Sequence, residues 1–263
     1  MSLLEVDGAR FNYRFEGPEN ASVLVLSHSL GADLSMWEPQ IPTLTKKFRV
    51  LRYDSRGHGL SGVSPGPYTL NQLSLDGLGL LNKLNIDRAH FCGLSMGGMV
   101  GQWLGVNAPE RFKSITLCNT AAKIGTAETW NTRIQTIKDG GMAAVASAVI
   151  SRWFTENFIK QSPAAVANIR QILLQTSPDG YVASCAALRD ADLRKAISLV
   201  KLPMLMISGT HDAVSPPAEG RFIVDHIPGA LYAELNASHL SNIEAPEAFT
   251  AALTKFLAQQ ETV

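Results

Sequence analysis

The segment Gly93-Leu94-Ser95-Met96-Gly97 places a serine between two glycines. It follows a short apolar run and precedes a helical pattern, so Ser95 is expected in a tight strand-to-helix turn, where glycines two residues away leave room for the crowded chain. The helix that begins there would aim the backbone N–H of Met96 at an anion forming near Ser95. This pattern predicts Ser95 as a nucleophile. A glycine-rich turn without a catalytic role is the alternative.

A serine hydroxyl needs a base and an acid that orients the base, and in this motif class they follow in the order serine, acid, histidine. Asp212 and His239 each come directly after a predicted strand, downstream of Ser95. The carboxyl ends of parallel strands share one sheet edge, so both side chains should meet there. We therefore predict Asp212 as the orienting acid and His239 as the base. The other histidines fit this order and placement less well: His28, His58, His90, His211 and His226.

An acyl-transfer site also needs a second backbone donor for the developing oxyanion, usually from the loop after an early strand. The segment from Ser27 to Gly31 is that loop, and we assign the donor to the N–H of Leu30; an ordinary strand-to-helix loop is the alternative. The segment 54–59, Asp-Ser-Arg-Gly-His-Gly, also contains residues that could be catalytic. Its aspartate precedes the serine, so we interpret this segment as scaffold.

These residues need a sheet to position them. An antiparallel hairpin is expected at 3–16, turning at Asp7-Gly8, because Asp-Gly is a strong hairpin signal. Apolar runs typical of buried strands follow at 22–27, 48–53, 89–92, 114–118, 204–208 and 230–235. Helical patterns alternate with them, which predicts an α/β fold with a mostly parallel sheet covered on both faces.

Between about residues 121 and 200 this alternation stops. Helical segments are expected at 129–138, 142–154, 164–175, 181–188 and 193–200. Helices inserted between two core strands would cover one end of the sheet. We therefore predict a core domain of residues 1–120 and 201–263 and a helical cap of residues 121–200.

The composition narrows the class of protein. Lysine plus arginine and aspartate plus glutamate are equal at 23 each, so no basic surface for nucleic acid is indicated. Cys92, Cys118 and Cys185 are scattered and odd in number, as in reduced cytosolic proteins. Neither a signal peptide nor a membrane span is expected. The sequence thus suggests a cytoplasmic protein that acts on a small molecule without a metal or organic cofactor.

Several motifs together resemble the α/β-hydrolase superfamily along nearly the whole chain. They are the elbow around Ser95, the segment 53–59, the segment Gly209-Thr210-His211-Asp212, and the closing run from Ser238-His239 to Glu244-Ala245-Pro246. Within it, the segment 27–31, the cap start at Trp130 with Arg133, and the segment 185–194 resemble bacterial 3-oxoadipate enol-lactonases of aromatic catabolism. His28-Ser29, where His-Gly is commoner in the superfamily, agrees with that subgroup.

This resemblance implies a small anionic lactone as substrate, whose carboxylate would need one cation among apolar walls. Arg133 is the candidate cation, and Trp130, on the same helical face, is the candidate wall. The alternative is a solvated surface arginine and a core tryptophan. If His239 acts as a neutral base, activity should fall as the pH drops below roughly 6 to 7.

The same triad could serve other reactions, because fold and triad do not fix the substrate. A general carboxylesterase, a cofactor-free perhydrolase and a C–C bond hydrolase remain open. Haloalkane dehalogenases and epoxide hydrolases are disfavoured, because their sites have an aspartate where this chain has Ser95. A non-enzymatic ligand receptor on the same fold is a more remote alternative.

Overall fold

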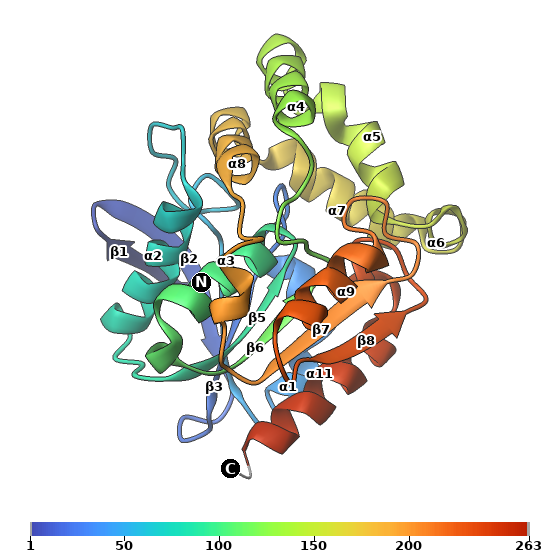
Figure 1. Ribbon diagram of the computed structural model, residues 1–263. Helices are drawn as coiled ribbons and strands as arrows, with labels where there is room; N and C mark the ends of the chain where they lie inside the picture. The colour runs from blue at the N-terminus through green and yellow to red at the C-terminus, as the bar shows by residue number, and fades with distance from the viewer. Residues whose placement is uncertain (1, 262–263) are drawn as a thin grey trace.

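The computed structural model describes residues 2–261 and contains a mixed eight-stranded sheet with helices on both faces (Figure 1). The order across the sheet is β1-β2-β4-β3-β5-β6-β7-β8. The strands are β1 (Ser2–Val6), β2 (Ala9–Glu16), β3 (Val23–Ser27), β4 (Arg49–Tyr53), β5 (Ala89–Leu94), β6 (Phe112–Cys118), β7 (Met204–Gly209) and β8 (Leu231–Leu235). The predicted α/β fold with an N-terminal hairpin is confirmed. Residues 1 and 262–263, which fall within the predicted core domain, lie outside the described residues.

The hairpin and the parallel strands follow from the residue pattern. Asp7 and Gly8 both have positive φ values, 47° and 76°, as a two-residue hairpin turn requires. β2 pairs antiparallel with β4, and all later pairs are parallel. Every residue of β5 and β7 is buried, because helices cover both faces of these central strands.

The strand expected at 230–235 is present, but the prediction that it is buried is wrong. β8 lies at the edge of the sheet, and only Leu235 of its five residues is buried. Tyr232 and Glu234 instead form surface contacts with Arg221. An apolar run alone does not tell an edge strand from a central one.

The core helices pack against the sheet from both sides. α3 contacts β3, β5 and β6, α9 contacts β7 and β8, and α11 contacts β6, β7, β8 and α1. Their bounds are α1 (Ile41–Leu44), α2 (Leu70–Lys83), α3 (Met96–Asn107), α9 (Pro217–His226), α10 (Ser241–Glu244) and α11 (Pro246–Gln260). No helix within residues 2–261 is long and apolar enough to cross a membrane.

The helical insert between β6 and β7 lies beyond one end of the sheet, at the top of Figure 1. It contains α4 (Ala127–Gly140), α5 (Ala143–Trp153), α6 (Glu156–Gln161), α7 (Pro163–Gln175) and α8 (Pro178–Asp190). α4 packs on α8 and α5, and α5 packs on α7. The insert therefore has internal contacts of its own and can cover the end of the sheet where β5, β6 and β7 terminate.

Two expectations for the insert differ from the structure. The segment 193–200, expected as a helix, is a loop with one short 3₁₀ turn at Ile197–Leu199. The backbone N–H of Leu193 donates to Ala122 O at 2.8 Å, so the segment begins attached to the chain that follows β6. α6 was not expected. It is short, and its N-cap is Thr155, whose hydroxyl accepts a hydrogen bond from the N–H of Phe158.

Candidate active site

Ser95 occupies a sharp turn between β5 and α3. Its φ and ψ are 57° and −109°, a backbone conformation that residues other than glycine rarely adopt. A Cβ on Gly93 would lie 2.1 Å from Gly97 O, and a Cβ on Gly97 would lie 2.2 Å from Ser27 O. Both glycines are therefore required by close backbone contacts. The structure has the strand–turn–helix context that the serine motif predicted.

Asp212 and His239 meet at the carboxyl ends of β7 and β8. His239 Nδ1 lies 2.8 Å from Asp212 Oδ2, and both side chains are almost completely buried. The other carboxylate oxygen, Oδ1, accepts hydrogen bonds from the N–H groups of Val214 and Ser215 at 2.7 and 2.9 Å. The carboxylate is thus held from two sides, and it fixes the orientation of the His239 ring.

The ionisation of Asp212 is controlled by opposing effects. Burial raises the pKa of Asp212, because the charged form loses solvent. The charge and hydrogen bond of His239, the N–H of Ser215 and the amide of Asn119 outweigh burial, so the net pKa lies below its ordinary value. Asp212 is therefore an anion at neutral pH and can stabilise a protonated His239.

The loop with Leu30 lies against the start of α3. Gly97 N–H donates to His28 O at 3.2 Å, which ties this loop to the turn at Ser95. Gly31 N–H donates to His58 Nε2 at 3.0 Å, so the next peptide is anchored from the other side. Leu30 lines the same cavity as Ser95. The two proposed oxyanion donors, the N–H groups of Leu30 and Met96, come from these neighbouring turns.

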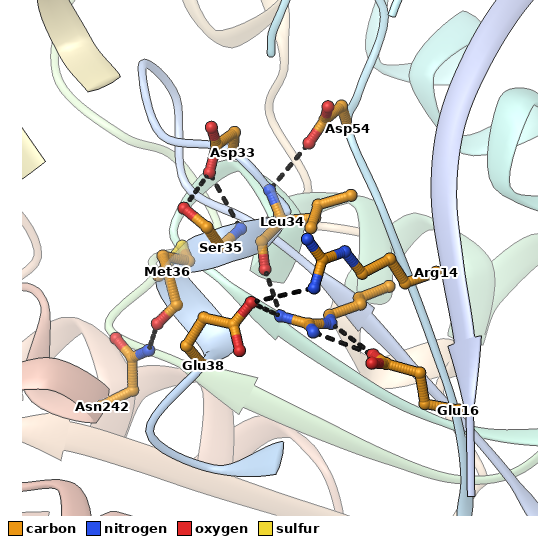
Figure 2. Close-up of polar contacts among 10 residues, drawn as sticks. Arg14, Glu16, Asp33, Leu34, Ser35, Met36, Glu38, Asp54 and Asn242 are labelled. Carbon is orange, nitrogen blue, oxygen red and sulfur yellow. Dashed lines mark hydrogen bonds and ion pairs between the residues drawn. The ribbon is translucent and has the colours of Figure 1, made fainter. Parts of the chain in front are cut away.

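The segment 54–59 acts as scaffold for this loop. The Asp54 carboxylate accepts hydrogen bonds from Leu34 N–H at 2.8 Å, from Asn12 Nδ2 and from Leu60 N–H. Figure 2 shows the Asp54–Leu34 contact and, below it, Asn242 donating to Met36 O at 2.8 Å. The chain that follows Leu30 is therefore held by residues from three separate parts of the core.

A charged cluster stabilises the same region. Arg52 is buried and pairs with Glu16 and Glu38, at 2.8 Å each. Arg14 lies 3.4 Å from the same Glu38 carboxylate (Figure 2). Asp33 begins the short 3₁₀ helix at Leu34–Trp37 by accepting a hydrogen bond from Ser35 N–H. Arg52 also donates to Leu34 O at 3.4 Å, so the cluster holds the start of this 3₁₀ helix.

A small cavity lies between the sheet edge and the insert. Core and insert both contribute to its wall. The lining residues are Ser29, Leu30, Ser95, Ile124, Trp130, Arg133, Val149, Arg152, Trp153, Tyr181, Leu188, Val214 and His239. The structure thus brings Ser95, His239, Leu30, Trp130 and Arg133 to one cavity, with Asp212 directly behind His239.

Trp130 and Arg133 lie together on α4. Trp130 is buried and its Nε1–H donates to Ile124 O at 2.6 Å, so the indole is fixed. The Arg133 guanidinium carbon lies 5.1 Å from the centre of the Trp130 ring, a cation–π distance. No carboxylate within residues 2–261 forms an ion pair with Arg133. The positive charge of Arg133 is therefore available to an anionic ligand.

Other lining residues were not identified from the sequence. Tyr181 on α8 packs over the loop, because a Cβ on Gly31 would lie 2.7 Å from the Tyr181 ring. Burial raises the pKa of the Tyr181 hydroxyl, and the Arg133 guanidinium partly offsets this effect. Arg152 and Trp153, at the end of α5, also line the cavity. They lie in ordinary helical patterns, so no motif distinguishes them from surface and core residues.

Comparison with known proteins agrees with this geometry. The family model for the alpha/beta hydrolase fold matches residues 22–246. 3-Oxoadipate enol-lactonase 2 and 3-oxoadipate enol-lactonase 1 of Acinetobacter baylyi are 42% and 40% identical to this chain. Each alignment covers 95% of this chain and 94% of the relative. The crystal structure of the enol-lactonase from Burkholderia xenovorans LB400 is 48% identical, with a TM-score of 0.97 over 98% of this chain and all of that chain. The chain therefore belongs to the α/β-hydrolase family, in the group that contains the 3-oxoadipate enol-lactonases.

Proposed function

We propose that this protein hydrolyses 3-oxoadipate enol-lactone to 3-oxoadipate, with Ser95 as nucleophile, His239 as base and Asp212 as the acid that orients it. The main support is the cavity that Ser95 and His239 share with Arg133, which forms no ion pair within residues 2–261, in a chain 40% to 48% identical to enol-lactonases. A nucleophile, a base and the cations Arg133 and Arg152 line one largely apolar cavity, which suits a small ester that carries a carboxylate.

The Asp212–His239 pair determines which ring nitrogen acts as base. Nδ1 donates its hydrogen to Asp212, so Nε2 carries the free lone pair. Nε2 removes the proton from the Ser95 hydroxyl as Oγ bonds to the lactone carbonyl carbon. The carbonyl oxygen becomes an oxyanion that the N–H groups of Leu30 and Met96 stabilise.

Collapse of this tetrahedral intermediate breaks the ring C–O bond and leaves an acyl group on Ser95. The leaving group is an enolate, which takes up the proton that His239 removed from Ser95 and becomes the ketone of the product, so His239 is neutral again. An enolate leaves more readily than an alkoxide, so this step needs little acid assistance. His239 then takes a proton from water, the hydroxide adds to the acyl carbon, and Ser95 departs with that proton. One water is consumed, and the new carboxylic acid ionises to a second carboxylate and releases one proton.

Arg133 is proposed to hold the carboxylate that the lactone already carries. A guanidinium binds a carboxylate by two parallel hydrogen bonds, which fixes orientation as well as charge. Trp130 supports Arg133 and forms the adjacent wall, since its indole is fixed by Ile124 O. Bound in this way, the substrate would be oriented before attack, which lowers the entropic part of the barrier.

We further propose a cytoplasmic protein that acts on a small molecule and not on nucleic acid. The three cysteines are buried and free, although Cys92 Sγ and Cys118 Sγ lie only 3.7 Å apart, which suits a reducing compartment. Equal numbers of acidic and basic residues offer no charge excess for a polyanion.

The deciding experiment measures the wild type beside Ser95→Ala on 3-oxoadipate enol-lactone and on p-nitrophenyl acetate. We expect a wild-type kcat/KM above about 10⁵ M⁻¹s⁻¹ on the lactone, far above the value for the ester, and a loss of roughly 10⁴-fold or more in the variant. Circular dichroism of both proteins controls for folding.

Other outcomes would contradict the proposal in distinct ways. Comparable, weak, serine-dependent rates on both substrates would indicate a general esterase or another triad hydrolase, such as a perhydrolase or a C–C bond hydrolase. A lactone rate that survives in Ser95→Ala would exclude Ser95 as nucleophile. No serine-dependent rate on either substrate would favour a ligand receptor.

A further inference from the structure

The tripeptide Cys118-Asn119-Thr120 lies at the end of β6. It forms hydrogen bonds with the backbone of Ser95, with the Asp212 carboxylate and with the loop that carries His239. Cys118 O accepts a hydrogen bond from Ser95 N–H at 2.9 Å, and the Thr120 hydroxyl donates to Ser95 O at 2.9 Å. The backbone on both sides of the Ser95 side chain is thus attached to β6. Asn119, between them, points its side chain the other way along the edge, toward Asp212 and the His239 loop.

The Asn119 amide makes two hydrogen bonds at this edge. Nδ2 donates to Asp212 Oδ2 at 3.0 Å, the same oxygen that accepts from His239, and to Ser238 O at 3.1 Å. Ser238 directly precedes His239 in the chain. One amide group therefore contacts both the acid and the backbone that carries the base.

The orientation and position of this amide are themselves fixed. Asn119 Oδ1 accepts a hydrogen bond from the Ser241 hydroxyl at 2.6 Å, which directs Nδ2 toward Asp212. Asn119 N–H donates to Ile207 O on β7 at 2.8 Å, and the residue has a positive φ of 44°. Asparagine tolerates that conformation better than most residues. Gly209 leaves the space, because a Cβ there would lie 3.0 Å from Nδ2.

We infer that Asn119 is a positioning residue for the proposed Ser95–His239–Asp212 triad: it holds Asp212 and the His239 loop in register with the end of β6, to which the Ser95 backbone is hydrogen-bonded. Without the amide, Asp212 Oδ2 would keep only the His239 ring as a side-chain donor, and Ser238 O would lose a partner. Oδ2 would then be positioned only by the ring that it orients, while Oδ1 stays bound to Val214 and Ser215, and the imidazole would be held less firmly relative to Ser95 Oγ.

This role predicts a specific kinetic change, and the inference rests on the proposed triad. Asn119→Ala should lower kcat on the lactone about 10- to 100-fold, the effect of losing a hydrogen bond to a charged group, and leave KM within about twofold. The ¹H NMR signal of the His239 Nδ1 proton, far downfield in a histidine–carboxylate hydrogen bond, should shift or broaden. Loss of stability alone would change neither kcat per folded molecule nor this signal.

Two further variants keep the test decisive. Asn242→Ala removes another fully buried asparagine amide, one that donates to Met36 O away from Asp212, and should lower the melting temperature while the His239 proton signal stays in place. Ser241→Ala leaves Asn119 intact but frees its amide, and it should lower kcat by a smaller factor than Asn119→Ala. If Asn119→Ala does not fold, Ser241→Ala tests the positioning role of Asn119 in its place.

The inference is wrong if folded Asn119→Ala, or Ser241→Ala in its place, keeps wild-type kcat and an unchanged His239 proton signal, or if its defect lies in KM alone. Ser95→Ala, assayed beside them, separates this failure from failure of the proposed function. If Ser95→Ala is inactive while the Asn119 and Ser241 variants resemble wild type, the result supports the proposed triad and contradicts the positioning role of Asn119.

Discussion

His58 Nε2 accepts a hydrogen bond from the backbone N–H of Gly31, at 3.0 Å, and so anchors the loop that carries Leu30. Burial lowers the pKa of His58 to about 3, with a further contribution from the neighbouring His28. The rings of these two histidines are 5.1 Å apart and both are fully buried. His58 can therefore keep its acceptor role through the neutral and mildly acidic range.

This low pKa makes the protein sensitive to acid. Between about pH 6.5 and pH 3 the unfolded chain binds a proton at His58 that the folded protein does not, so stability is complete above this window and falls as the pH drops through it. One such proton corresponds to about 1.4 kcal/mol per pH unit. His58→Gln, which retains an acceptor without a titratable group, should flatten this slope. Urea unfolding between pH 4.5 and 7 would measure it, and equal slopes in both proteins would contradict the prediction.

Gly93→Ala should disrupt the turn at Ser95. The added Cβ would lie 2.1 Å from Gly97 O, a backbone atom that can move only if the whole turn moves. We expect a loss of about 3 kcal/mol or more in unfolding free energy, together with loss of activity. Gly229→Ala is the matched control, because its Cβ meets nothing within 4 Å and its positive φ costs only about 1 kcal/mol. Similar melting temperatures for the two variants would argue against the steric requirement at Gly93.

Arg133→Gln should slow hydrolysis of the anionic lactone far more than hydrolysis of a neutral ester. Loss of a charged hydrogen-bonding group predicts a decrease of about 10- to 100-fold in kcat/KM for the lactone. The rate on p-nitrophenyl acetate should change little. Arg152→Gln, at an exposed arginine of the same cavity, is the matched comparison and should have the smaller effect. Equal losses on lactone and ester in Arg133→Gln would exclude Arg133 as the carboxylate-binding residue.

Asp76→Asn should destabilise the core next to the loop at 54–59. Arg56 is buried, with Nε 2.5 Å from Asp76 Oδ2, and a second guanidinium nitrogen also contacts this carboxylate. Burial raises the pKa of Asp76, an effect that Arg56 partly offsets. Removing the carboxylate leaves Arg56 buried without its partner, which costs about 3 to 5 kcal/mol. Chemical denaturation checks this. Glu156→Gln, in an exposed pair with Lys160, should show no resolvable change.

The sequence alone predicted the features that depend on local spacing. Only a glycine fits two residues before or after Ser95, so the motif identified the turn without any knowledge of tertiary contacts. The hairpin at Asp7-Gly8 and the alternation of strands with helices are also local patterns. The order of Ser95, Asp212 and His239 then indicated one sheet edge, because parallel strands end on the same side.

Tertiary structure decided what depends on neighbours distant in the chain. Asn119 has no motif, since its partners Asp212 and Ser238 are 93 and 119 residues away and reach it only because β6 lies beside β7. Leu193 N–H bonds to Ala122 O, 71 positions earlier in the chain, and β8 is largely exposed because it lies at the edge of the sheet within the described residues 2–261. Such hydrogen bonds and burial are set by which strands and loops become neighbours, and a local pattern of residues does not contain that information.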